Sequence, residues 1–489
     1  MSSETQKNKP LLLIAFTIIF VMLFAYFFNG VTIFGYTIKP VDLFMDIKPD
    51  SLQSSNQKTF NKMDNFVNRN YQKNKANKYL TTTLSAGFDP EFINKIILNT
   101  KYLFFPDETS LSYEQQKLNI KDEPITGNLE QMKYFFKALK EAKTEQVRVA
   151  HYGDSGIEGD EITSNIRKDL QNEFGGRGVG FLSITSQDIS FRMTTKQSFS
   201  NNWQTISVLT ANQNNLPLGI NGFVFIPQGI SWVKYSTTDW IPNLKTFSAA
   251  KLYYSNAKNS SINYSFNDGV NQTAVLKPGS TLNELILDAP DRKAQSFKLT
   301  TSMKDQAYFY GVSLESGNGV YVDNFPWRGN TGLGFTKISE SSFQQFSKLI
   351  NYKLIILSFG ANEASFSSQD NTWYATQMVK VINNLKKVFP KTSILLIGVG
   401  DKSIKKGTRF VTDPNIPLIL KVQKNIAAKT GIAFWNLFNA MGGYNSMETW
   451  VNANPPLALM DYTHPSLQGA DKIGDMIAQA LIKAYKNFN

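Results

Sequence analysis

Ser155 stands at a point in the chain where a serine can act as a nucleophile. It lies in the stretch 147–160, which starts as a short apolar alternation typical of a buried strand and breaks at a Gly-Asp-Ser turn. Beyond the turn, apolar residues recur every four positions from Ile162 to Phe174, which is typical of an amphipathic helix. Ligands bind at the carboxyl ends of strands in α/β sheets, and helix starts offer unpaired backbone N–H groups. We therefore expect an exposed Ser155 hydroxyl with hydrogen-bond donors beside it.

A serine hydroxyl is a weak nucleophile until a base takes its proton, and histidine is the usual base. The chain has two histidines, His151 and His464. His151 lies on the predicted strand itself, too close in sequence to fold back onto Ser155. His464 follows Asp461 by three residues, and a carboxylate at that spacing can fix the imidazole tautomer and stabilise the imidazolium. The residues predict Ser155 with His464 as its base and Asp461 as the group that orients the base.

Four motifs of this chain resemble those of the SGNH (GDSL-type) hydrolases and follow that family's order. They are Gly153-Asp154-Ser155, a loop glycine at Gly329, Gly360-Ala361-Asn362, and Asp461 with His464. Each motif alone is also ordinary turn or loop chemistry, whereas their combination after the right elements is specific. The resemblance implies that Ser155 is the nucleophile, His464 the base and Asp461 its partner.

The resemblance also implies an oxyanion hole, a set of donors for the oxygen that gains charge during acyl transfer. Its donors would be the backbone N–H groups of Ser155 and Gly329 and the side-chain amide of Asn362. Gly332 lies in the same loop as Gly329 and is an alternative to it. The matching part of the chain covers roughly residues 137–177 and 314–489.

The extended first motif, GDSGIEGDEITSNIR at 153–167, and Glu363-Ala364 after the third motif resemble a narrower group. That group comprises the peptidoglycan O-acetyl esterases and their relatives encoded with membrane O-acyltransferases. A common member has a histidine directly after the motif serine, where this chain has Gly156. The resemblance implies a serine esterase acting on an acylated cell-envelope polysaccharide through an acyl-enzyme. An O-acetyltransferase working with a membrane-bound O-acyltransferase and a non-catalytic glycan-binding scaffold are the alternatives.

The N-terminal stretch predicts a membrane anchor. Residues 11–28 carry no charge and are dominated by apolar side chains. A run of this length can cross a bilayer as one helix. No small-residue cleavage site follows, and lysines precede the run, so we expect an uncleaved signal anchor over 10–29 and a cytoplasmic tail over 1–9. A buried core helix is the less favoured alternative. The body would then lie in the periplasm or outside the cell, held on the inner membrane by a single pass.

Periodicity divides the rest of the chain into three kinds of segment. Residues 30–130 combine a polar spacer with an N-terminal extension. In 131–182 and 315–489, short apolar runs alternate with helical patterns, which predicts a parallel sheet with helices on both faces. The resemblance implies that this sheet is flavodoxin-like. In 183–314 short alternating segments separated by turn residues predict an inserted β-sandwich.

The resemblance implies that this sandwich is similar to carbohydrate-binding modules. Its tryptophans, Trp203, Trp232 and Trp240, fit either a sugar-stacking surface or the sandwich core, and the core is favoured. The chain has no cysteine, which excludes a disulfide framework and thiolate metal sites. A net charge of +12 arises from scattered lysines without a basic patch, so no nucleic-acid partner is expected. No metal ligand set is present in the pattern, and we expect neither metal nor cofactor.

Overall fold

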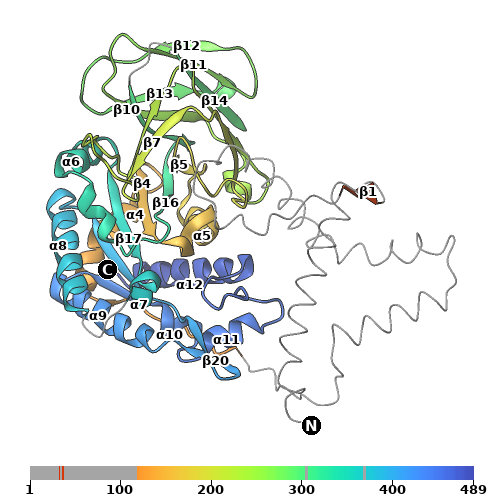
Figure 1. The fold of residues 1–489 in the computed structure, drawn as a ribbon. Helices are drawn as coiled ribbons and strands as arrows, with labels where there is room; N and C mark the ends of the chain where they lie inside the picture. The colour runs from red at the N-terminus through yellow and green to blue at the C-terminus, as the bar shows by residue number, and fades with distance from the viewer. Residues whose placement is uncertain (1–31, 34–35, 38–117, 303–306, 367–370, 489) are drawn as a thin grey trace. The chain divides into compact units, whose positions relative to one another are not determined.

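The computed structural model describes residues 32–33, 36–37, 118–302, 307–366 and 371–488 (Figure 1). The chain divides into two compact units, Met1–Thr82 and Thr83–Asn489. In the first unit the structure describes one antiparallel pair, β1 (Thr32–Ile33) with β2 (Tyr36–Thr37). The anchor predicted over 10–29 lies outside the described residues. Within the described ranges, no helix combines the length and the hydropathy that a membrane span requires.

A parallel sheet forms the centre of the second unit. Its strand order is β16-β4-β17-β18-β21-β3, and every neighbouring pair is parallel except the short edge pair of β21 and β3. Counted along the chain, the five parallel strands are arranged 2-1-3-4-5, the order of flavodoxin-like sheets. The strands are β3 (Thr126–Gly127), β4 (Gln146–Gly153), β16 (Gly319–Pro326), β17 (Tyr352–Ser358), β18 (Ser393–Gly398) and β21 (Ala433–Asn436).

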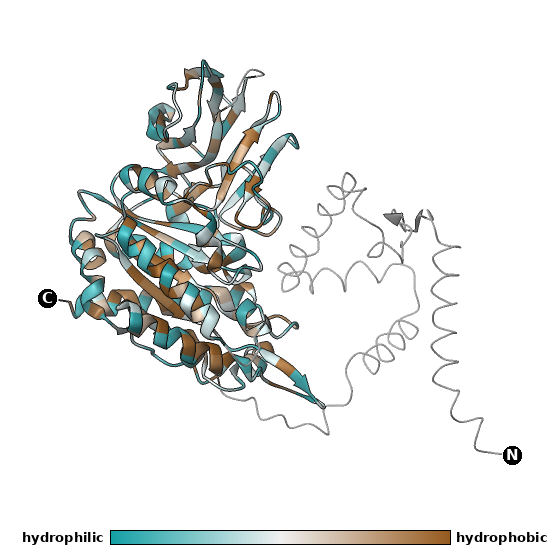
Figure 2. Cartoon of the chain, turned by 60° about the vertical axis from the view of Figure 1, so that its left-hand side comes forward, coloured by the Kyte–Doolittle hydropathy of each residue, from teal (hydrophilic) through white to brown (hydrophobic). Residues whose placement is uncertain are grey.

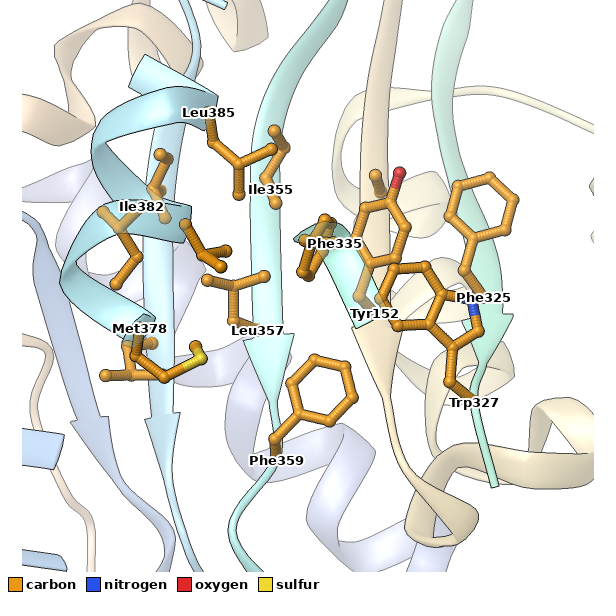
Figure 3. Close-up of a cluster of buried hydrophobic side chains, with 14 of the residues drawn as sticks. Tyr152, Phe325, Trp327, Phe335, Ile355, Leu357, Phe359, Met378, Ile382 and Leu385 are labelled. Carbon is orange, nitrogen blue, oxygen red and sulfur yellow. The ribbon is translucent and has the colours of Figure 1, made fainter. Parts of the chain in front are cut away.

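Helices cover both faces of this sheet, as the apolar runs of its strands require. In β17 the side chains of Leu354 and Ile356 join one buried cluster, and those of Ile355 and Leu357 join the other. Figure 2 shows apolar strands between helices with polar outer surfaces, and Figure 3 shows the side on which α8 packs. One face carries α4 (Lys133–Lys140), α5 (Glu161–Phe174), α11 (Ser446–Val451) and α12 (Leu467–Lys486). The other carries α6 (Glu340–Leu349), α8 (Thr372–Val388) and α9 (Asn415–Thr430).

Between α5 and β16 the chain forms two antiparallel sheets, whose facing side chains make a third buried cluster. Trp203 is buried there with its ring edge-on to Phe309, whereas Trp240 is half-buried against the cluster. One sheet contains β5 (Gly180–Leu182), β7 (Trp203–Ser207), β8 (Phe223–Pro227), β10 (Ala249–Ser255), β13 (Asn283–Asp288) and β15 (Tyr308–Glu315). The other contains β6 (Thr195–Phe199), β9 (Trp232–Thr237), β11 (Ser261–Phe266), β12 (Gln272–Val275) and β14 (Ser296–Thr301).

A buried ionic network joins these antiparallel sheets to the parallel sheet. Arg148 on β4 donates to Asp323 on β16 at 2.8 Å and to Glu315 at the end of β15. Lys251 on β10 pairs with the same Glu315 at 2.7 Å, and the Tyr352 hydroxyl donates to Asp323 at 2.7 Å. Burial alone would raise the pKa of Glu315, but Arg148 and Lys251 hold it down at about 2. Removing one partner would leave a buried charge unpaired, so this network fixes how the two sheet systems meet.

Candidate active site

Ser155 begins the first helical turn after β4, at the carboxyl edge of the parallel sheet. It is the first residue of the 3-10 helix η3 (Ser155–Asp160), which leads into α5. The Asp154 side chain caps this turn by accepting the Gly156 N–H at 2.9 Å, and the Asp154 N–H donates to the Ser358 carbonyl at the end of β17. The strand order changes direction between β4 and β17, and ligands bind at such switch points. Ser155 therefore lies where the sequence predicted, at the position of the sheet most suited to a ligand.

The structure brings Ser155, His464 and Asp461 into one hydrogen-bonded chain. The Ser155 Oγ lies 2.9 Å from His464 Nε2, and His464 Nδ1 lies 2.7 Å from Asp461 Oδ2. Because the carboxylate only accepts, the imidazole hydrogen lies on Nδ1 and Nε2 is left to accept the serine hydroxyl. This arrangement can move the serine proton to His464 while Asp461 stabilises the imidazolium that forms.

Asp461 is held in position by its own loop. Its Oδ1 accepts the backbone N–H groups of Thr463 and His464, each at 3.0 Å. Partial burial raises the pKa of Asp461, but the hydrogen bonds from the His464 side chain and backbone outweigh it and leave the pKa below its ordinary value. The carboxylate is therefore charged at neutral pH, as a partner of an imidazolium must be.

A hairpin that no sequence motif predicts supports this loop. It is formed by β19 (Ser403–Lys406) and β20 (Arg409–Thr412), the latter beside α11 in Figure 1. Tyr462 lies between Asp461 and His464 with a φ of 55°, and its ring stacks on Phe410 at 3.5 Å between centroids and 6° between planes. The Ser403 N–H donates to the Tyr462 carbonyl at 3.0 Å. No sequence motif marks Phe410, because its role depends on a contact between segments far apart in the chain.

We expect Phe410→Ala to lower kcat on an aryl acetate by up to about tenfold. A stacked ring pair contributes roughly 0.5–1.5 kcal/mol, and losing it lets the loop with Asp461 and His464 move out of line. KM should change little, because the proposed mechanism gives Phe410 no contact with the substrate. Phe410→Tyr keeps the ring and should keep the rate. Steady-state kinetics of the two variants test this, and an unchanged kcat in Phe410→Ala would show that the stack is not needed.

His151, the other histidine, is buried and bonded on both ring nitrogens to groups other than Ser155. Its Nδ1 lies 2.8 Å from the Thr163 hydroxyl, and its Nε2 lies 2.8 Å from the Ser358 hydroxyl. Thr163 donates its own hydrogen to Asn324, so it must accept from Nδ1–H, and Nε2 accepts from Ser358. Burial lowers the pKa of His151 to about 3. His151 is therefore a neutral support of the strand ends and is not placed to take the Ser155 proton.

The structure distinguishes Gly329 from Gly332 in the loop after β16. The Gly332 N–H donates to the Asn330 side chain at 2.8 Å, and a Cβ at Gly332 would lie against Met378 and Phe359 in the core. Gly329 has a φ of 72°, and a Cβ there would meet nothing within 4 Å. Its N–H has no partner in the part of the chain that the structure describes. Of the two glycines, Gly329 is the one with a backbone donor available to a ligand.

Asn362 joins the loop of Gly329 to the turn of Ser155. It lies at the start of α7 (Ala361–Phe366), directly after β17, and its Nδ2 donates to the Asn330 carbonyl at 3.1 Å. The same side chain hydrogen-bonds the Asp154 carboxyl. Burial raises the pKa of Asp154 to about 6, although the hydrogen bonds from Gly156 and Asn362 oppose the shift. The side-chain amide of Asn362 is thus bonded both to the loop of Gly329 and to the turn that carries Ser155.

The chain is similar to known proteins in its fold. No protein-family model matches the chain, and no curated protein matches it. A solved structure described as a peptidoglycan O-acetylesterase in action is 20% identical, with a TM-score of 0.61, and the match covers 74% of this chain and 99% of that one. The chain has the fold of this esterase. The α/β fold predicted from the sequence, a parallel sheet with helices on both faces, is therefore confirmed.

Two further solved structures match with lower scores. A family two carbohydrate esterase from Cellvibrio japonicus is 9% identical, with a TM-score of 0.26, over 60% of this chain and 100% of that one. A salicylyl-acyltransferase from a tetracycline biosynthetic pathway is 12% identical, with a TM-score of 0.28, over 64% and 98%. Because one fold serves many activities, what this chain does has to be argued from its own site.

Proposed function

We propose that this protein is an exported, membrane-anchored serine esterase that removes O-acyl groups, acetyl among them, from a cell-envelope polysaccharide. The observation that carries the proposal is the hydrogen-bonded chain Ser155–His464–Asp461 at the switch point of the sheet. The available N–H of Gly329 and the nearby amide of Asn362 support it. The polysaccharide substrate rests on the motif resemblance and on the described activity of the solved structure with the same fold.

The reaction begins when Ser155 Oγ attacks the ester carbonyl carbon while His464 Nε2 takes its proton. The carbonyl oxygen becomes an oxyanion that accepts hydrogen bonds from the Ser155 and Gly329 N–H groups and the Asn362 amide. The tetrahedral intermediate collapses as the ester C–O bond breaks and His464 returns the proton to the departing sugar hydroxyl. Water then attacks the acyl-Ser155 with His464 as base, which releases the carboxylic acid and the serine.

A scaffold without catalysis would not need the Ser155–His464–Asp461 chain, but an acyltransferase would use it as it stands. In that reaction a sugar hydroxyl replaces water in the second half, and a membrane-bound O-acyltransferase would supply the acyl group. The two activities differ in product. Hydrolysis releases free acid, whereas transfer moves the acyl group to a second saccharide, and mass spectrometry of the saccharides distinguishes the two.

We expect the intact protein to release acetate from O-acetylated peptidoglycan and Ser155→Ala to release none above the uncatalysed background. The loss follows from removing the only nucleophile that the proposed mechanism uses. Ser341→Ala is a matched control, since it removes an exposed hydroxyl on α6. Acetate measured enzymatically tests the prediction. Equal release by Ser155→Ala and the unchanged protein would rule out the proposed reaction.

Membrane anchoring through residues 10–29 is part of the proposal. It is supported by the uncharged apolar run and by the lysines that precede it. We expect the full-length protein to sediment with inner membranes and to resist extraction by carbonate. A variant lacking residues 1–29 should be recovered in soluble form. Recovery of a shortened soluble form of the unaltered protein from the periplasm would instead indicate cleavage of this segment.

A further inference from the structure

A cavity of about 100 Å³ lies behind the turn that carries Ser155. Its wall includes Asp154 and Gly156, the two neighbours of Ser155, and Thr463 and Pro465, the two neighbours of His464. The cavity is therefore lined by the sequence neighbours of both residues that share the Ser155–His464 hydrogen bond. The proposed reaction uses Ser155 and His464 and assigns no role to the cavity.

The deeper wall of the cavity is apolar. It is built where the end of β18 meets α10 (Leu437–Met441), α11 and α12, four elements that all contribute buried side chains. Polar residues such as His151, Asp154 and Asp401 also line the cavity, but the wall built by these four elements offers an apolar ligand apolar contacts. Methionine side chains adapt to the shape of what they contact. The side chains that matter here are Ile397, Leu437, Met441, Met447 and Trp450.

The volume indicates the size of the ligand. An apolar cavity of about 150 Å³ holds benzene, so about 100 Å³ holds a chain of about four carbons. An acetyl group places a single methyl beyond its carbonyl carbon and would leave most of this space empty. A straight acyl chain with about three or four carbons beyond its carbonyl carbon would fill it.

Gly156 leaves room at the end of the cavity next to Ser155. A Cβ built on Gly156 meets only Asp154 Oδ1, at 3.2 Å, so the space beside this residue is otherwise open. The backbone of Gly156 has no positive φ, hence the absence of a side chain is not required by its conformation. Because Gly156 both follows Ser155 and lines the cavity, the open space beside it is the route that an acyl chain on Ser155 Oγ would take to the apolar wall.

We propose that this cavity binds the acyl chain of the substrate and that the site prefers esters of short straight acids, such as butyrate, over acetate. The proposal rests on the proposed esterase function and specifies its acyl group. The covalent step is the one already given: the bond from Ser155 Oγ to the acyl carbon forms, the ester C–O bond breaks, and the leaving alcohol takes the proton. The tail of the acid then lies among Met441, Met447 and Trp450.

The test compares aryl acetate with aryl butyrate on the full-length protein. Each methylene that leaves water for an apolar site contributes about fourfold, so kcat/KM for butyrate should exceed that for acetate by about tenfold. Met447→Trp fills the cavity, and Gly156→Ala narrows its end beside Ser155. Both substitutions should lower the ratio of kcat/KM for butyrate to kcat/KM for acetate at least about tenfold. The rate on acetate shows that each variant is folded and active. Met476→Trp adds the same bulk to α12 outside the cavity wall and should leave the ratio unchanged.

The possible results test the acyl pocket and the esterase function separately. A wild-type ratio below one, or a ratio that Met447→Trp and Gly156→Ala both leave unchanged, overturns the acyl pocket while the esterase stands. A protein that turns over neither ester overturns the proposed function itself. A wild-type preference for butyrate that both variants remove establishes the pocket.

Discussion

Ser155→Ala and His464→Ala should each lower kcat on an aryl acetate by about 10⁴- to 10⁶-fold, and the double variant should be hardly slower than either. In serine hydrolases whose reacting residues act as a unit, removing one member removes most of what the others contribute. Here the unit is visible as two successive hydrogen bonds, of 2.9 Å from Ser155 to His464 and 2.7 Å from His464 to Asp461. Pre-steady-state kinetics measure both the acylation burst and the turnover, and neither single variant should show a burst.

Two other variants should lose less activity than His464→Ala and serve as comparisons for it. Asp461→Asn keeps the hydrogen-bonding shape and loses the charge, so we expect a smaller loss than for His464→Ala. His151→Ala removes the other histidine without touching the Ser155–His464 bond, and its kcat should stay within about tenfold of the unchanged protein. It should also unfold more easily, because Thr163 and Ser358 lose their partner. Full turnover in His464→Ala would show that another group takes the serine proton.

The placement of the site was predictable because it depends on strand ends. The motifs at Ser155 and Asn362 follow apolar runs, and the carboxyl ends of parallel strands meet at one edge of a sheet. The chain has two histidines, and because His151 lies on the predicted strand, His464 was the candidate for the base. The order of the strands was implied by the resemblance, and the structure shows it as 2-1-3-4-5.

Other features of the site depend on contacts that no local pattern records. Gly329 and Gly332 are equivalent in sequence, and they differ because one N–H is bonded to Asn330 and the other is not. The hairpin of β19 and β20 carries no motif, and its connection to the site is a ring stack between Phe410 and Tyr462. The membrane anchor over 10–29 remains a prediction from the sequence.

Asn362→Ala should lower kcat about 100- to 1,000-fold with little change in KM. Losing one donor of an oxyanion hole costs about 2.7–4 kcal/mol in other enzymes, because the bond to the oxygen strengthens only as charge develops. In the structure the Asn362 amide is bonded to the Asn330 carbonyl and to the Asp154 carboxyl. For Asn362 to serve the oxyanion, one of its two N–H groups must exchange such a partner for the substrate oxygen.

A structural role for Asn362 would produce a different result, and Asn330→Ala separates the two. Asn330 accepts the N–H groups of Gly332 and Gly334 through its side chain, so its loss loosens the loop of Gly329 without removing an oxyanion donor. If Asn362 acts on the oxyanion, Asn330→Ala should cost far less in kcat than Asn362→Ala, and the thermal stabilities of the two variants should be similar. Equal losses of kcat would mean that Asn362 acts by holding the loop, and the oxyanion would then rest on the backbone donors of Ser155 and Gly329.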